Sequence, residues 1–454
     1  MSLGLETQNS KMKNRRSGKA AATNTCRVCA PLGAVLAFRG IRGCVPLVHG
    51  SQGCATYIRR YLISHFREPM DVASTSFTES STIFGGRSNL AEALANLTRA
   101  YHPEVVGVCT TCLAETIGED TPGMLRDLAR RPDLAPTLFV ATPSFKGCQH
   151  RGFHDAVAAI LAQTAQGGTR LRQLNLLAGP VSPADLRHLR ELVDALGLPT
   201  ILFPDYSETL DGPSLASYAP IPAGGISLEE LARAGRSALT IQLGAVLEPG
   251  PGEVLSERHG VPLTRLGLPI GVTATDALVA ALAAAAGVPI PDALTAERGR
   301  LVDAYVDGHK YLAGQRVAIV GDPDLAAALA GFCAEIGLTP VLVGSGAVTG
   351  RLAAALGQLG AGSAEVIEDA DHECIGARIT ALRPDLILGP SKSYPTARAL
   401  GIPLLRVGFP VHDRIGAGRL LHLGYRGTQR LFDELVNTLL ANAQDTSETG
   451  YAYL

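Results

Sequence analysis

The sequence lacks an excess of charge of either sign. Its 454 residues include 40 Lys and Arg against 42 Asp and Glu, which gives a formal net charge of −2. A balance this close to zero argues against nucleic acid as the main partner. The one basic run, "KMKNRRSGK" at 11–19, is interpreted as part of a solvated tail rather than a binding arm.

Long hydrophobic runs are also missing. The longest, "ALVAALAAAAGV" from Ala277, stops at Pro289 and is too short to cross a bilayer, so a buried helix is expected there. The first residues lack the apolar stretch of a signal peptide. We therefore expect a cytoplasmic protein with no membrane partner, whose nine cysteines are thiols or metal ligands rather than disulfides.

Nucleotide-binding motifs are a third absence. The segment "RVAIVGDPDL" at 316–325 follows the strand–turn–helix pattern of a dinucleotide site, but it lacks the G-x-G-x-x-G spacing. Pro323 and Asp324 are expected to start a helix instead. No Walker A sequence occurs elsewhere, so the chain is not expected to bind a nucleotide itself.

Short apolar runs alternate with amphipathic segments along most of the chain. Each run is continuous and ends in Gly, Pro, Thr or Asp, which is typical of buried parallel strands. Between two of them, Ser182 is an expected helix N-cap and Gly197 an expected C-terminal stop. This alternation predicts doubly wound, Rossmann-like α/β domains with parallel sheets. The expected strands are 104–109, 137–142, 174–179, 200–205, 316–322, 339–344 and 385–390.

The chain is long enough for several domains, and we expect three. "GVPLTRLGLPI" at 260–270 and "GIPLLRVGFPV" at 401–411 share Gly, Pro, Leu, Arg, Gly and Pro at identical offsets. We interpret this echo as one domain plan used twice; the alternative is chance similarity of two β-edge loops. The predicted partition is an N-terminal tail at 1–25, α/β domains at 26–165, 170–295 and 316–440, a linking helix at 296–315 and a C-terminal tail at 441–454.

The cysteines are unevenly spread, with seven of the nine between Cys26 and Cys148. Four of these fall in turns at element ends, where the edge of one sheet can gather them. Each lies near Gly, Thr or Ser, whose N–H and O–H groups can donate to sulfur. The four candidates are Cys29 in "CAPLGA", Cys54 in "HGSQGC", Cys112 in "TTCLAETIGED" and Cys148 in "TPSFKGCQ". Cys333 and Cys374 are expected to be packing thiols.

Gathered thiolates select zinc or iron–sulfur clusters. Two C-x-x-C pairs, Cys26/Cys29 and Cys109/Cys112, make structural zinc an alternative. About 80 residues separate these pairs, however, and Cys109 falls in a strand pattern, whereas zinc ribbons place their pairs about 15–20 residues apart. Scattered structural thiols are a second alternative. The favoured interpretation is an iron–sulfur cluster, either a cubane held by four thiolates or half of a larger cluster shared by two chains.

At these residues the sequence resembles the nitrogenase component 1 family, and specifically its beta-type subunits. The resemblance runs from residue 26 to about 435 and is highly specific. The matching stretches are "CAPLGA", "VPLVHGSQGC", "SHFREP", "FTESSTIFGG", "TTCLAETIGED", "TPSFKG", "PDYSETLDG", "PDLILG" and "RVGFPVHDRIG…LLHLGYRG".

The resemblance implies three α/β domains, an α2β2 tetramer with an alpha-type subunit, and a transient ATP-hydrolysing iron protein as electron donor. It also implies an eight-iron P-cluster at the boundary with the alpha chain, with Cys29, Cys54 and Cys112 as the ligands from this chain. In the family a serine that ligates the oxidised cluster follows "TPSF-x-G"; this sequence has Cys148 there, a departure that also allows a 4Fe-4S cluster with Cys148 as fourth ligand.

Two further roles follow from the resemblance. Phe84 in "TIFGG" matches an aromatic that meets the iron protein, and Tyr57 matches a residue on the electron path. Core packing is the alternative for both. The family's substrate-reducing cofactor lies in the alpha subunit, so no catalytic residue of that site is expected here.

Three kinds of family member compete. A catalytic beta subunit is favoured over the cofactor-maturation scaffold, because scaffold chains often lose one or two of the three cysteines. A nitrogenase beta subunit proper is disfavoured, because the chain lacks the long N-terminal extension of the molybdenum enzyme. "HGSQGCATYIRRYLISHFREP" is similar to a nitrogenase-like clade that includes methylthio-alkane reductase. The expectation is therefore an oxidoreductase subunit for reductive C–S cleavage of small thioethers.

Overall fold

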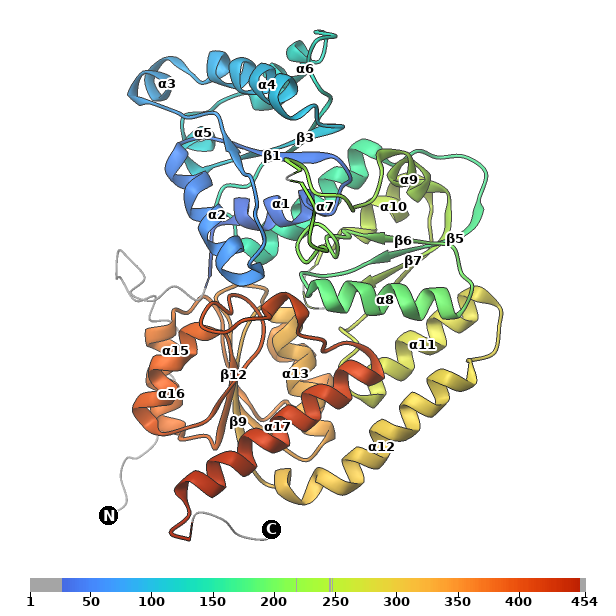
Figure 1. Cartoon of the computed structure of the whole chain (residues 1–454), viewed down its shortest axis with the longest axis vertical. Coiled ribbons are helices and arrows are strands. Elements are labelled where there is room, and N and C mark those ends of the chain that lie inside the picture. The colour runs from blue at the N-terminus through green and yellow to red at the C-terminus, as the bar shows by residue number, and fades with distance from the viewer. Residues whose placement is uncertain (1–26, 218, 245, 247, 450–454) are drawn as a thin grey trace, which may run out of the picture.

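The computed structural model describes residues 27–217, 219–244, 246 and 248–449, so Cys26 and the whole predicted N-terminal tail lie outside the described residues. Three parallel sheets organise the chain, with helices packed around them (Figure 1). The fold class is thus confirmed. All seven predicted strands are present. The first sheet has the strand order β2 (Ala73–Ser74), β1 (Cys44–His49), β3 (Val105–Thr110), β4 (Thr137–Val140). The second has the order β6 (Thr200–Phe203), β5 (Leu171–Leu177), β7 (Ser237–Leu243), β8 (Leu263–Leu266). The third has the order β11 (Glu365–Ile367), β10 (Thr339–Gly344), β9 (Arg316–Val320), β12 (Leu386–Gly389), β13 (Leu404–Arg406).

The three sheets share one winding. In each, the first strand along the chain lies beside the second and the third, and the fourth lies beyond the third; β11 is an extra edge strand in the last sheet. The two echoed segments occupy the same place in two sheets. Gly260 and Gly401 adopt φ of +64° and +66° as C-caps of α10 and α16, and the edge strands β8 and β13 follow them. The predicted domain boundaries remain a proposal, with one sheet in each span.

The helices follow the strands as the alternating pattern predicts. Ser182 caps α8, because its Oγ accepts a hydrogen bond from the Asp185 N–H at 2.9 Å. Pro323 begins α13, with Asp322 as its N-cap. The helices are α1 (Ala30–Phe38), α2 (Gln52–Phe66), α3 (Glu79–Phe84), α4 (Arg87–Tyr101), α5 (Cys112–Thr116), α6 (Thr121–Leu128), α7 (Gln149–Thr164), α8 (Pro183–Ala195), α9 (Leu228–Arg233), α10 (Gly252–His259), α11 (Val272–Ala286), α12 (Asp292–Leu312), α13 (Pro323–Glu335), α14 (Leu352–Gln358), α15 (His372–Leu382), α16 (Tyr394–Leu400) and α17 (Gly424–Thr446).

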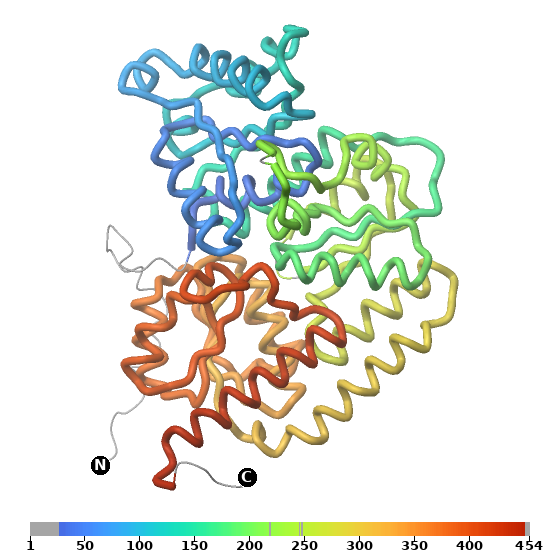
Figure 2. The backbone as a smooth tube through the Cα atoms, in the orientation of Figure 1, coloured from blue at the N-terminus to red at the C-terminus, as the bar shows by residue number. Residues whose placement is uncertain are grey.

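The linking helix is α12, which begins at Asp292, after Pro291, rather than at 296. It lies alongside α17 (Figure 2). Gly308 permits this contact, since a Cβ there would lie 2.6 Å from the ring of Phe432 on α17. In the described part of the chain, the search for a helix both long and apolar enough to cross a membrane found none.

Helices α1 and α7 approach each other unusually closely. A Cβ on Gly33 would lie 1.9 Å from the carbonyl oxygen of Gln149, and one on Gly152 would lie 2.0 Å from that of Ala30. Both obstacles are backbone atoms, which cannot rotate away. The contact places the N-terminal ends of the two helices together, and Cys29 and Cys148 form an isolated antiparallel bridge there. Glycine at these two positions therefore positions two of the four candidate cysteines.

Gly152→Ala should force α1 and α7 apart and lower the free energy of unfolding by about 1–3 kcal/mol or more. Denaturant unfolding of the full chain measures this. Gly299→Ala is the matched control, because Gly299 lies in the helix α12 and a Cβ there meets nothing within 4 Å; it should be neutral or stabilising by up to about 1 kcal/mol. Equal effects of the two substitutions would show that the close contact is not required.

Candidate functional site

Each of the four candidate cysteines stands at the start of a helix. Cys29 and Cys148 are the N-caps of α1 and α7. Cys54 lies in the first turn of α2, after β1, and Cys112 is the first residue of α5, after β3. The first N–H groups of a helix lack partners within it and carry partial positive charge. A cysteine sulfur at a helix start can accept hydrogen bonds from these N–H groups when it binds a metal.

Three of the four lie close enough to interact: Cys29 and Cys112 both contact Ser144, in the turn after β4, and Cys54 acts electrostatically on Cys29. The Ser144 N–H donates to Cys112 Sγ at 3.1 Å, and its Oγ accepts from the Ala30 N–H at 3.2 Å. Burial raises the pKa of the Cys29 thiol; Cys54 and Cys112 raise it further, and a hydrogen bond with Ser144 opposes the rise. These three thiols therefore share one electrostatic environment, in which a bound cationic centre would relieve their mutual repulsion.

The three grouped thiols are accessible, unlike the structural ones. Cys29 is exposed, and Cys54 and Cys112 are half-buried. Cys44 and Cys109 are fully inside the first sheet, where burial raises the pKa of each thiol to about 12. Because Cys109 is buried in β3, Cys109 and Cys112 do not form the exposed pair that a zinc ribbon needs. Accessible thiols at an edge suit a metal–sulfur cluster whose remaining ligands come from another chain.

Cys148 lies beside this group but in a different environment. Its side chain is 5% exposed, and burial raises the pKa of its thiol to about 11. Asp322 adds to that rise, while the backbone amides of His150 and Arg151 oppose it. The two charges that act on the pKa of this thiol are those of Asp322, which raises it, and Arg27, which lowers it; none of the other three cysteines contributes.

The glycines of "HGSQGC" have different roles. A Cβ on Gly50 would lie 2.2 Å from Thr111 Oγ1, so Gly50 lets the turn after β1 pack against the residue that precedes Cys112. A Cβ on Gly53 would meet nothing nearer than Ser51 Oγ, at 4.0 Å. Gly53 therefore leaves open space beside Cys54. The Ser51 hydroxyl donates to Cys54 Sγ at 3.5 Å.

A buried pair under the thiols was not foreseen from the sequence. His49 Nε2 lies 2.7 Å from Glu119 Oε2, and the two side chains are 0% and 3% exposed. Burial lowers the pKa of His49, and Glu119 opposes that shift. Glu119 also accepts a hydrogen bond from the Gly86 N–H. The end of β1 is thereby tied to the α3–α4 loop. His49 and Glu119 both belong to stretches that resemble the nitrogenase component 1 family, "VPLVHGSQGC" and "TTCLAETIGED". Their spacing in the sequence does not indicate that they pair.

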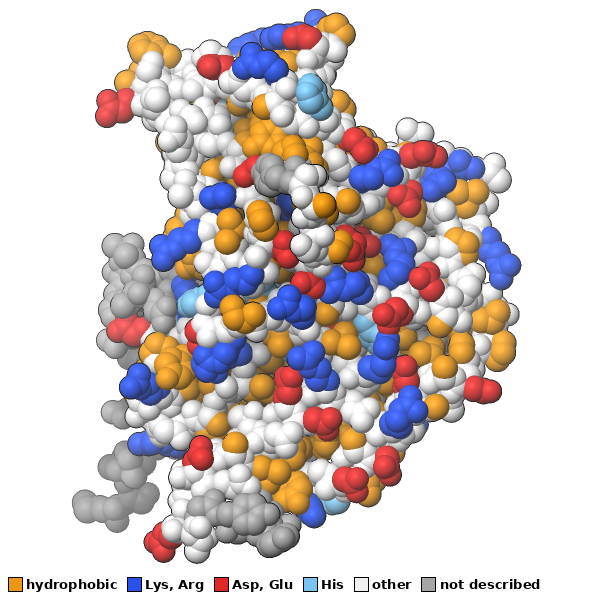
Figure 3. Space-filling view, viewed as in Figure 1, with side chains coloured by type: hydrophobic (Ala, Val, Ile, Leu, Met, Phe, Trp, Pro, Cys, Tyr) orange, Lys and Arg blue, Asp and Glu red, His pale blue; other side chains and the backbone are white. Residues whose placement is uncertain are grey.

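Tyr57 and Phe84 are not core residues. Tyr57 lies one turn after Cys54, is 44% exposed, and donates from its hydroxyl to that of Tyr61 at 3.0 Å. Burial and Tyr61 raise the pKa of Tyr57 to about 12. Phe84 ends α3 and is 85% exposed, beside Ile83 at 75%; Figure 3 shows hydrophobic side chains at that end of the molecule. Core packing is therefore wrong for Phe84.

The two late cysteines differ from each other. Cys333 is buried in α13, as expected. The expectation of a packing thiol is wrong for Cys374, which is exposed. Asp371 caps α15 by accepting from the Cys374 N–H at 2.8 Å, and this sets Cys374 in the first turn on the outer side of the helix.

Comparisons with known proteins agree with this arrangement. The chain is 36% identical over 430 residues to the nitrogenase molybdenum-iron protein beta chain of Clostridium pasteurianum, covering 93% of this chain and 94% of that one. It is 37% identical to the beta chain of Frankia alni, over 93% of this chain and 83% of that one. It is also 34% identical to the nitrogenase iron-molybdenum cofactor biosynthesis protein NifN of Nostoc sp., over 93% and 94% of the two chains.

The expectation that a nitrogenase beta subunit would carry a long N-terminal extension does not hold for all relatives. A molybdenum-iron beta chain is matched over 94% of its length, so a missing N-terminal extension does not separate this chain from nitrogenase beta subunits.

Structure and family comparisons agree. A solved chain described as "Nitrogenase Cp1 at pH 6.5" superposes with a TM-score of 0.92 at 35% identity, covering 97% of this chain and 98% of that one. The family described as "Nitrogenase component 1 type Oxidoreductase" matches residues 29–440. The chain therefore belongs to the nitrogenase component 1 type oxidoreductase family, as a beta-type subunit.

Proposed function

We propose that this chain is the beta-type subunit of a nitrogenase-like reductase and holds its share of an iron–sulfur cluster at the boundary with an alpha-type subunit. The observation that carries the proposal is the gathering of Cys29, Cys54 and Cys112 at an accessible edge. When bound, the cluster would store and transfer electrons. It is either an eight-iron P-type cluster with ligands from both chains or a 4Fe-4S cluster.

The protein's own contribution is to hold three thiolates in place and tune them. Hydrogen bonds from the Ser144 N–H and the Ser51 hydroxyl reach the sulfurs of Cys112 and Cys54, and donors of this kind tune metal-binding sulfurs. Tyr57 stands one turn from Cys54, on the face through which electrons would leave toward the alpha chain. An α2β2 tetramer suits a cluster that is shared between two kinds of chain. A cytoplasmic location agrees with the described cysteines, which are all free thiols.

The proposed substrate rests only on the sequence motif around Cys54, "HGSQGCATYIRRYLISHFREP". No catalytic residue is assigned to this chain, since the substrate would be reduced at a cofactor in the alpha subunit. The similarity of the Cys54 region to the methylthio-alkane reductase clade supports two-electron cleavage of a C–S bond in a small thioether, giving a thiol and an alkane. Release of methanethiol rather than ammonia by the assembled complex separates this proposal from nitrogenase activity.

A maturation scaffold is the second candidate, supported by the similarity to NifN at 34% identity. The presence of all three grouped cysteines favours the reductase, because a scaffold needs a smaller cluster that does not accumulate electrons.

Cys54→Ala or Cys112→Ala should lower iron and acid-labile sulfide in the anaerobically purified complex to about a tenth and loosen the pairing with the alpha subunit, because a shared cluster also links the chains. Metal analysis and size-exclusion chromatography measure the two effects. Cys374→Ala removes an exposed thiol outside the group and should change neither. Undiminished iron and sulfide in the Cys54 variant would contradict the assignment.

Phe84→Ala should raise the apparent KM for the iron protein about tenfold while leaving the metal content intact. An exposed aromatic at a docking face contributes contact area, not ligation. Ile415→Ala is the matched control, because Ile415 is 76% exposed on the third sheet domain. Turnover that is unchanged in the Phe84 variant would remove the docking role.

Cys148→Ala should leave the iron count of the reduced complex unchanged and alter the electron paramagnetic resonance spectrum only after oxidation. The buried, protonated thiol becomes a ligand only when the cluster demands one more anion. Cys148→Ser, which restores the family residue, is the control and should retain an oxidation-linked signal. Loss of the whole cluster in the reduced variant would indicate a four-iron site with Cys148 as a permanent ligand. Identical spectra in all states would make Cys148 a bystander.

A further inference from the structure

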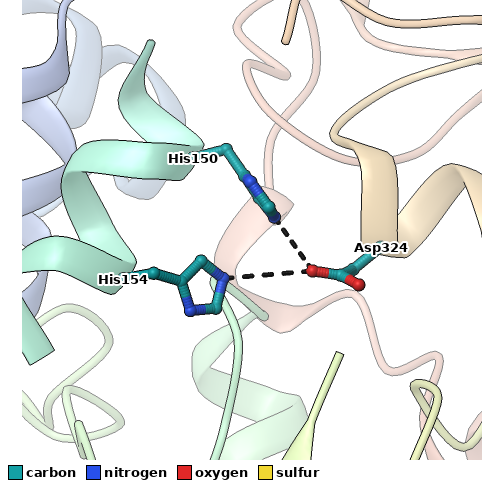
Figure 4. Close-up of side chains that lie close together, drawn as sticks. All are labelled: His150, His154 and Asp324. Carbon is teal, nitrogen blue, oxygen red and sulfur yellow. Dashed lines mark hydrogen bonds and ion pairs between the residues drawn. The ribbon is translucent and has the colours of Figure 1, made fainter. Parts of the chain in front are cut away.

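Helix α7 carries a second set of possible metal ligands, away from the grouped thiols. His150 and His154 are one helical turn apart and project toward Asp324, in the first turn of α13 (Figure 4). The three side chains are 1%, 5% and 5% exposed. His150 Nε2 lies 3.0 Å and His154 Nε2 lies 3.9 Å from Asp324 Oδ2. The first and third sheet domains meet at this point.

The histidines lack the partners that buried imidazoles need. Both ring nitrogens of His154, and Nδ1 of His150, make no hydrogen bond in the described part of the chain. Asp324 Oδ1 is held by the Val246 N–H at 2.8 Å, which leaves Oδ2 to face both rings. A buried polar group without a partner costs about 1–3 kcal/mol. An ion placed between the two Nε2 atoms and Oδ2 would give His154 Nε2 the partner that it lacks and would bind all three side chains at once.

The charges at the junction also favour a cation. Asp322 caps the same helix and accepts from Gln149 Nε2 at 2.8 Å, so two carboxylates of α13 face α7. A single proton on His150 offsets only one of them and leaves His154 unpaired. A divalent ion held by two neutral imidazoles and Asp324 would place positive charge beside both carboxylates and so offset the cost of burying them.

The distances suit a small transition-metal ion. Zinc binds His nitrogen and carboxylate oxygen at about 2.0–2.2 Å, so two tetrahedral ligands lie about 3.4 Å apart. The two measured separations, 3.0 and 3.9 Å, bracket that value, and all three ligand atoms lie within 4.8 Å of one another. Asp324 also lines a cavity of about 620 Å³ between α11 and α13. The carboxylate of the proposed site is therefore next to open space, although neither histidine lines this cavity.

We propose that His150, His154 and Asp324 form a divalent transition-metal site of the zinc type that pins α7 to α13. The ligand set is nitrogen and oxygen only, which distinguishes the site chemically from the thiol group. Because α7 begins at Cys148, the ion would fix the helix that carries this thiol against the third sheet domain. The site is independent of the proposed function, and its metal can be counted separately from iron.

The test uses zinc as the probe and the complete complex as the sample. After equilibration with zinc and removal of free metal, elemental analysis should find one zinc per chain, and zinc-edge X-ray absorption should show imidazole and oxygen ligands without sulfur. His154→Ala and the isosteric Asp324→Asn should each weaken zinc binding at least tenfold. Iron and sulfide should stay unchanged in both variants, which separates this site from the thiol cluster.

His372→Ala is the matched control. His372 is also buried, at 5% exposure, with an Nε2 that has no hydrogen-bond partner in the described residues, but it belongs to no group of three possible metal ligands there; its loss should leave zinc binding intact. Absence of zinc in the wild-type complex, sulfur in the zinc ligand shell, or full zinc binding by Asp324→Asn would each overturn the proposal. The absorption measurement needs no variant, so a folding defect cannot leave the proposal undecided.

Discussion

The close packing of α1 against α7 fixes where the thiols of this chain can lie. Gly33 and Gly152 bring two helix backbones to a separation that no side chain would allow, and their N-terminal ends then hold Cys29 and Cys148 side by side. The strands of the first sheet deliver Cys54 and Cys112 to the same edge. Ser144 joins these parts through backbone and hydroxyl contacts. Three thiols gathered at an accessible edge are incomplete as a metal site within one chain, which is why a partner subunit enters the account.

The same winding in all three sheets explains how much of the fold the sequence predicts. Continuous apolar runs such as 316–322 and 339–344 are central strands, and the pattern identifies them well. Strand β1 was missed because Pro46 and His49 interrupt its apolar run, although all six residues are buried. Strand β7, with Thr240 and Gln242, carries buried polar residues, and β2, β11 and β13 are edge strands of two or three residues. Short edge strands contain too few residues to show a period.

Cys112 and Cys148 were predictable because turns rich in Gly, Ser and Thr follow the predicted strands 104–109 and 137–142, whereas Cys29 and Cys54 were marked by the glycine-containing turns beside them. The resemblance already separated Cys148 from the other three cysteines, but the burial of its thiol was not predictable, since it depends on how α7 packs against the start of α13. The His49–Glu119 pair joins residues 70 apart, and the His150–Asp324 pair joins residues 174 apart in different sheet domains. Contacts of this kind arise from the packing of whole elements, so single-sequence patterns contain no signal for them.

Iron-edge anomalous diffraction from anaerobic crystals of the chain with its alpha-type partner tests the central claim most directly. The account predicts one strong iron peak at the boundary between the two chains, in contact with the sulfurs of Cys29, Cys54 and Cys112. An iron peak elsewhere in this chain, or no iron density beside these three thiols in an intact complex, would contradict it.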